Sequence, residues 1–230
     1  MRLIFKTCRN NEIVPFNNQF ALNGAINKWL GNNNKWHDIS GNYNISGLIG
    51  GKQCGNGLIY PNGAKIIVSS LDKELIETIL RGIYKDPSIK WGMNITGELE
   101  IENDNGIHNG KNFFYSISPI LIKKCVSESE YKFFTYLDKE ANDLLTKITI
   151  NKLKTIDPNV DLTGFKVEFA TDYEKTKKIK TVMVKNVKNV VSNCPILIHG
   201  KKKTVELCYF TGISNSTNSG FGCISKKKEW

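Results

Sequence analysis

Hydrophobic and polar positions alternate along some stretches of the chain and recur at helical spacing along others. Residues 2–8 (RLIFKTC) alternate and predict a strand, whereas 72–84 place five apolar side chains on a single helical stripe. By the same reasoning the first hundred residues contain strands at 2–8, 43–51, 58–71 and 93–102 and helices at 16–30 and 72–84. This order, β-α-β-β-α-β, is the ferredoxin-like unit.

The second half of the chain repeats this pattern. Strands are predicted at 112–124, 165–170, 179–191 and 204–210, and Ser127-x-x-Glu130 matches a capping box that would start a helix running to about Leu153. We therefore expect an α+β protein with two tandem ferredoxin-like domains, residues 1–105 and 112–230. The linker near 103–111 (NDNGIHNGK) is rich in Asn and Gly.

Charge is distributed unevenly along the chain. Residues 1–115 carry 12 basic and 10 acidic side chains, whereas 116–230 carry 20 and 12, and the stretch from 175 to 203 holds nine lysines and no acid. Such a field attracts polyanions, nucleic acid above all, although a solvated lysine face is the simpler alternative.

Cysteine and histidine spacing predicts no metal site or cofactor. The six cysteines form no C-x-x-C pair, and the three histidines lie far apart in sequence. The chain contains no run of 18 apolar residues, and its N-terminal apolar stretch is too short for a signal peptide. We expect a cytoplasmic protein with no membrane partner.

A glycine-rich segment near the C-terminus, TGISNSTNSGFG (211–222), has few side chains to bury and predicts a flexible loop. Its consecutive N–H and O–H donors can form an anion-binding concavity, although many such segments are plain loops. It matches neither a P-loop nor a Rossmann fingerprint. The residues expected to hold phosphate are Gly212, Ser214, Asn215, Ser216, Thr217, Gly220 and Gly222, together with the upstream lysines Lys201, Lys202 and Lys203.

This segment resembles the glycine-rich signature of the repeat-associated RNA-binding superfamily of CRISPR systems. Within it, the chain is most similar to the CRISPR repeat-RNA-processing endoribonucleases. Ser214 stands where that signature has a second glycine. A looser match is W-H-D at 36–38 followed by Y-N-I-S-G-L at 43–48, and the order of elements fits over nearly the whole chain.

The resemblance implies metal-independent cleavage of precursor crRNA into guide RNAs. The ribose 2′-hydroxyl attacks its own 3′ phosphate, which leaves 2′,3′-cyclic phosphate and 5′-hydroxyl ends. His37, in a polar loop after the first helix, is the candidate acid or base because the unperturbed pKa of imidazole, about 6.5, lies near working pH. Lys52 and Tyr43 are candidate helpers in catalysis, and Lys35 is a candidate RNA contact.

The other histidines are weaker candidates. His108 lies in the predicted linker, and His199 ends a strand beside the lysines, where it contacts RNA phosphate or only occupies a turn.

Two other functions stay open. A non-catalytic crRNA-binding subunit of the same superfamily would keep the fold and the glycine-rich segment without a working histidine. A generic RNA-binding module would stack bases on exposed aromatic residues, but FFYS at 113–116 lacks the usual preceding pattern. Dimerisation and membership of a larger interference complex are also undetermined by the sequence.

Overall fold

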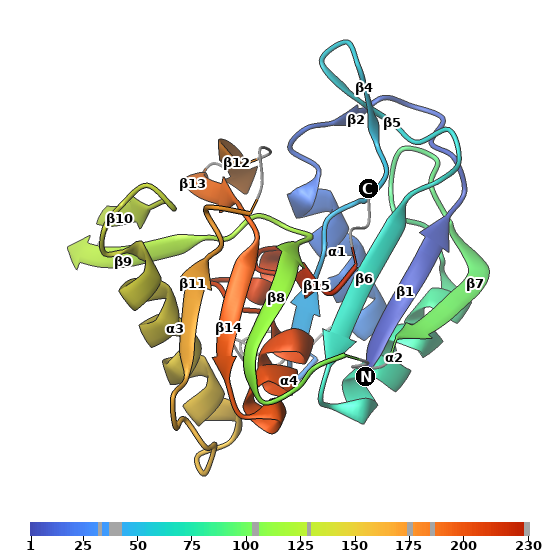
Figure 1. Cartoon of the computed structure of the whole chain (residues 1–230). Helices are drawn as coiled ribbons and strands as arrows, with labels where there is room; N and C mark the ends of the chain where they lie inside the picture. Colours follow the sequence, from blue (N-terminus) through green and yellow to red (C-terminus); the bar gives the residue numbers. More distant parts are fainter. Residues whose placement is uncertain are drawn as a thin grey trace.

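The structure is a computed structural model that describes residues 1–31, 34–36, 43–102, 106–127, 130–173, 177–184 and 187–227. Its strands form two four-stranded antiparallel sheets that lie side by side, with helices packed against each (Figure 1). None of the described helices is both long and apolar enough to cross a membrane.

The N-terminal sheet follows the predicted order of elements. These are β1 (Arg2–Thr7), α1 (Gln19–Leu30), β3 (Tyr43–Ile45), β6 (Lys65–Ser70), α2 (Lys73–Lys85) and β7 (Ile95–Glu102). The strand order β3-β6-β1-β7 is the ferredoxin-like arrangement. The Asp72 side chain caps α2 by accepting from the Leu75 N–H, and the predicted apolar stripe of this helix faces the core.

A small accessory sheet projects from this domain (Figure 1). It consists of β2 (Val14–Pro15), β4 (Lys52–Cys54) and β5 (Gly57–Ile59), in the order β2-β5-β4. The strand predicted at 58–71 is therefore two strands, β5 and β6, which belong to different sheets and are separated by the turn at 61–63.

The C-terminal sheet has the same topology. Its elements are β8 (Gly110–Ser116), α3 (Ala141–Ile156), β11 (Lys166–Phe169), β14 (Ile196–Gly200), α4 (Lys202–Thr211) and β15 (Ile224–Ser225), with strand order β11-β14-β8-β15. Two hairpins are inserted into it, β9 (Ile122–Ser127) with β10 (Glu130–Phe134) and β12 (Lys178–Val184) with β13 (Val187–Asn193). The prediction of two tandem ferredoxin-like domains is confirmed.

Three local predictions in this half were wrong. The strand predicted at 112–124 is two strands, β8 and β9, which belong to different sheets. Residues 204–210 alternate but lie within α4, where five of these seven side chains are buried, so the alternation does not mark one exposed face of a strand. Ser127 and Glu130 are not a capping box, because they end β9 and begin β10. The helix starts only at Ala141, after a turn in which Asp138 accepts from the Thr135 N–H.

Candidate functional site

The glycine-rich segment is not the flexible loop that its composition predicts. It leaves α4, runs between the two domains and reaches β15, and most of its length is buried. Ile213 and Phe221 belong to the core, and Ser214 and Thr217 are also buried. The segment is therefore a built part of the domain interface.

Close approach of the N-terminal domain explains glycine at the start of the segment. Gly212 has φ +74° and ψ 178°, a region essentially restricted to glycine. A Cβ there would lie 2.0 Å from Asn44 Nδ2, a residue of β3. Asn44 Nδ2 also donates to Gly222 O at 3.4 Å, and Gln19 Nε2 of α1 donates to Gly220 O at 2.6 Å. Backbone groups of the segment thus hold the two domains together.

Ser214, which stands where the signature has a second glycine, is hydrogen-bonded to the base of the β9–β10 hairpin. Its hydroxyl accepts from the Leu121 N–H at 3.1 Å, and the Asn215 N–H donates to Leu121 O at 3.1 Å. The Asn215 side chain accepts from the Lys123 N–H at 2.9 Å. Residues 214–215 therefore run alongside the base of the β9–β10 hairpin and fix its position.

The part of the segment that reaches solvent is a short turn. Residues 215, 216, 218 and 219 are partly exposed around the 3₁₀ turn η1 (Thr217–Ser219). Ser216 adopts a left-handed conformation with φ 56° and ψ 44°. Among the described residues, no acceptor is found for the backbone N–H groups of Ser216, Thr217 and Asn218. Three successive N–H donors that begin at a left-handed residue, and that have no acceptor in the part of the chain that the structure describes, suit an anion such as phosphate.

This turn contacts the strand that follows the loop containing the candidate histidine. The Thr217 hydroxyl donates to Tyr43 O at 3.3 Å, at the start of β3. His37 itself lies outside the described residues. Its neighbour Trp36 is buried and donates through Nε1 to Asp72 at 2.7 Å. Six residues after His37 the chain is therefore in contact with the turn.

The other residues that the sequence predicted for the site, Tyr43, Lys35 and Lys52, do not all lie at the turn. Tyr43 is in the core, and burial raises the pKa of its phenol to about 12. Lys35 pairs with Glu74 at 2.5 Å, and its ammonium lies 4.9 Å from the centre of the Trp36 ring. Lys52 is exposed on β4 of the accessory sheet, away from the turn.

Lys201, Lys202 and Lys203 lie at the opposite end of α4 from the glycine-rich segment. A helix of ten residues separates the two by about 15 Å. Lys202 and Lys203 pair with Glu206 at 3.4 Å and Asp157 at 3.5 Å, beside a cavity of about 440 Å³. The three lysines and the glycine-rich segment are close in sequence, but they do not form one continuous phosphate site.

The two weaker histidine candidates lie away from the turn. His199, on β14, pairs through Nε2 with Glu168 at 3.0 Å. His108 Nδ1 lies 2.9 Å from Asn109 O.

The sequence analysis did not identify Lys152 of α3, which contacts the start of the glycine-rich segment. Its ammonium donates to the carbonyls of Thr211 and Gly212, where α4 ends and the glycine-rich segment begins. Burial lowers its pKa to about 8. Helical spacing places Lys152 on the same face as Leu145 and Thr149, which was the available signal for a lysine directed inward.

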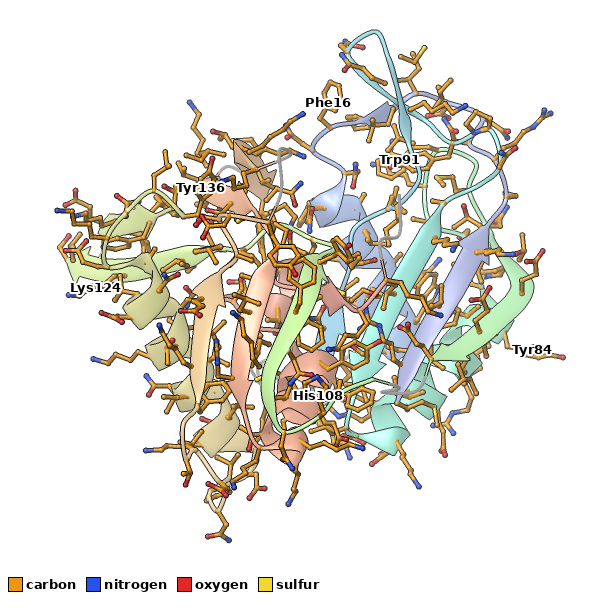
Figure 2. All side chains as sticks on the ribbon, viewed as in Figure 1. Phe16, Tyr84, Trp91, His108, Lys124 and Tyr136 are labelled. Carbon is orange, nitrogen blue, oxygen red and sulfur yellow. The ribbon has the colours of Figure 1, made fainter. Side chains whose placement is uncertain are left out.

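Basic side chains gather on the two inserted hairpins. We call these the hairpin lysines: Lys123, Lys124, Lys132, Lys178, Lys180 and Lys188. Figure 2 shows Lys124 pointing outward from β9. Between β12 and the start of α1 lies a cleft of about 580 Å³ whose lining includes Lys180 and the exposed Phe16. Three of the hairpin lysines thus lie on the β9–β10 hairpin, whose base contacts residues 214–215 of the glycine-rich segment.

Comparison with known proteins gives matches in sequence and in structure. The family model "CRISPR associated protein Cas6, C-terminal" matches residues 100–226. No match is found among curated protein sequences.

Solved structures share the fold over the whole chain. A Cas6-related protein from Pyrococcus furiosus superposes with a TM-score of 0.84 at 22% identity, covering 100% of this chain and 99% of that one. "An RAMP protein binding different RNA substrates" gives 0.83 at 20% identity, covering 99% and 100%. Thermus thermophilus Cse3, bound to an RNA representing a pre-cleavage complex, gives 0.52 at 8% identity, covering 98% of each chain.

Proposed function

The chain belongs to the Cas6 family of CRISPR-associated proteins, and we propose that it is a metal-independent endoribonuclease that cleaves CRISPR repeat transcripts into guide RNAs. Solved structures with the same fold include proteins described as bound to RNA, which supports RNA as the ligand. The expected products carry 2′,3′-cyclic phosphate and 5′-hydroxyl ends.

One observation carries this proposal: the turn at Ser216–Asn218, beside Tyr43, has three N–H donors for which the described residues provide no acceptor. Tyr43 lies six residues after His37 in the sequence, so the candidate imidazole and the strand that contacts this turn are close together in the chain. This cleavage requires a site that binds the phosphate and a group that transfers protons. In the proposed site they come from different domains.

The proposed reaction needs two proton transfers and stabilisation of charge. The 2′ oxygen loses its proton, forms a bond to phosphorus and displaces the 5′ oxygen, which takes up a proton as it leaves. His37 provides one of these transfers. The N–H groups of Ser216, Thr217 and Asn218 donate to the phosphate oxygens as negative charge builds up on them.

The chemistry can be tested directly with repeat RNA. We expect cleavage in excess EDTA, and we expect none when the scissile nucleotide carries a 2′-deoxyribose, because the nucleophile is then missing. Product ends are read by gel mobility before and after treatment with a phosphatase that opens cyclic phosphates. A strict requirement for Mg²⁺ would contradict the proposal, and tight binding without cleavage would identify a non-catalytic crRNA-binding subunit.

RNA affinity is expected to depend strongly on salt. Lysines that neutralise phosphates release counterions, and each contact to single-stranded RNA contributes about −0.7 to the slope of log K against log salt. Lys180→Gln should reduce the magnitude of this slope by about that amount. The matched control is Lys85→Gln, at the exposed end of α2, which should leave the slope unchanged. A flat salt profile in the unmodified protein would show that the hairpin lysines are not at the RNA interface.

A further inference from the structure

Arg2, at the start of β1, is a charged side chain with no exposed surface. Its guanidinium has three partners at the boundary of the two domains. Nε lies 3.1 Å from Glu102 Oε2, and Cζ lies 4.3 Å from the centre of the Tyr209 ring. Nη2 donates to Cys223 Sγ at 3.6 Å. The Arg2 side chain thus connects both domains.

The positions of these partners in the chain are informative. Tyr209 lies in the last turn of α4, just before the glycine-rich segment, and Cys223 follows Gly222 directly. Glu102 is the last residue of β7, where the N-terminal sheet ends. From the N-terminal domain, Arg2 therefore holds both ends of the segment that carries the exposed turn.

Burial of the Arg2 guanidinium is not explained by stability alone. Removing a guanidinium from water costs several kcal/mol unless good partners replace it, and a well-packed apolar residue often stabilises a protein more. Among the described residues, Arg2 Nε and Nη1 and Glu102 Oε2 have no hydrogen-bond partner, so the Arg2–Glu102 contact is an ion pair without hydrogen-bond geometry. Burial also raises the pKa of the Tyr209 phenol, so the ring beside the guanidinium stays neutral. Such a cluster fixes geometry more than it adds stability.

We propose that Arg2 is a positioning residue for RNA cleavage. It sets the place of the Ser216–Asn218 turn relative to the start of β3, which follows His37 by six residues in the chain. This inference rests on the proposed function. It makes Arg2 act through the glycine-rich segment, without any contact to the RNA.

The test compares cleavage rate with affinity in two variants. Arg2→Met keeps an unbranched side chain about as long as the aliphatic part of arginine and removes the guanidinium with its charge. Arg2→Met combined with Glu102→Gln also removes the carboxylate left without a partner. Displacing a bound group by about 1 Å can lower a rate by about 100-fold, and we expect a loss of that size in the single-turnover rate at saturating repeat RNA, with Kd raised less than about tenfold. The double variant should recover Tm but not the rate.

The matched control is Lys6→Met on the same strand, whose ammonium forms an exposed ion pair with Glu98. It should leave rate and Kd unchanged. If Arg2→Met does not fold, Tyr209→Leu provides the same test, because it removes the ring and keeps the ion pair between Arg2 and Glu102. An unchanged rate at saturation, or a rate that recovers together with Tm, would overturn the proposal.

A second measurement does not depend on cleavage. Hydrogen exchange of the RNA-free protein should be at least about tenfold faster across residues 211–222 in Arg2→Met, with α3 unchanged, because the segment has lost its anchor. Equal exchange in both proteins would overturn the positioning role. If the unmodified protein does not cleave repeat RNA, the proposed function fails, and hydrogen exchange still decides whether Arg2 holds the segment.

Discussion

His37→Ala is expected to lower the single-turnover rate of repeat-RNA cleavage by about 10²–10⁴-fold, the usual contribution of a positioned general acid or base. Kd should stay within a few-fold of the unmodified protein, because the N–H donors of the turn and the hairpin lysines are untouched. The rate is measured with labelled repeat RNA and excess protein, and Kd with RNA that carries a 2′-deoxyribose at the scissile position.

The matched control is His108→Ala, the same substitution at a histidine whose ring lies beside Asn109 O on the surface. It should change neither rate nor affinity. Equal rates for His37→Ala and the unmodified protein would rule out His37 as the catalytic group. A loss of affinity as large as the loss of rate would instead show that His37 contacts the RNA.

Gly212→Ala is expected to destabilise the protein by about 3 kcal/mol. Holding alanine in a backbone conformation that is restricted to glycine costs about 1–3 kcal/mol, and the new Cβ adds a clash. That Cβ would lie 2.0 Å from Asn44 Nδ2 and 2.9 Å from Gly222 O. For a chain of this size the shift in Tm is about 6–12 °C, read from thermal unfolding followed by circular dichroism.

Gly24→Ala is the control with the opposite expected sign. Gly24 lies inside α1, and a Cβ there meets nothing within 4 Å. Alanine in a helix is favoured over glycine by about 1 kcal/mol, so this variant should be as stable as the parent or more stable. Gly212→Ala without loss of stability would show that the close contact between the segment and β3 is dispensable.

The fold could be predicted because both sheets have clear local signals. The alternating stretches at 2–8 and 93–102 are strands β1 and β7, although burial does not alternate along either strand. The apolar stripe of α2 appears in the sequence as it does in the structure. The pattern failed in α4, where residues 204–210 alternate in polarity although the segment is a largely buried helix. The hydrophobic pattern also failed at β10, because the adjacent Phe133 and Phe134 are compatible with a helix and with a hairpin.

The candidate site was only partly predictable for a different reason. The motif identified residues 211–222, but burial of Ile213 and Phe221 depends on the second domain, which no local pattern describes. Arg2 and Lys152 were missed because each acts on residues far away in sequence. A basic side chain directed inward looks, in one sequence, like any surface charge.

The contact between Arg2 and Cys223 joins residues 221 positions apart, with consequences for synthesis. Domains of a growing chain generally fold in order from the ribosome. Here β1 is synthesised early, and its guanidinium finds all its partners only after residues more than 200 positions later have been added. The seam between the domains therefore closes only after the second domain has been synthesised, and the position of the glycine-rich segment is fixed at that stage.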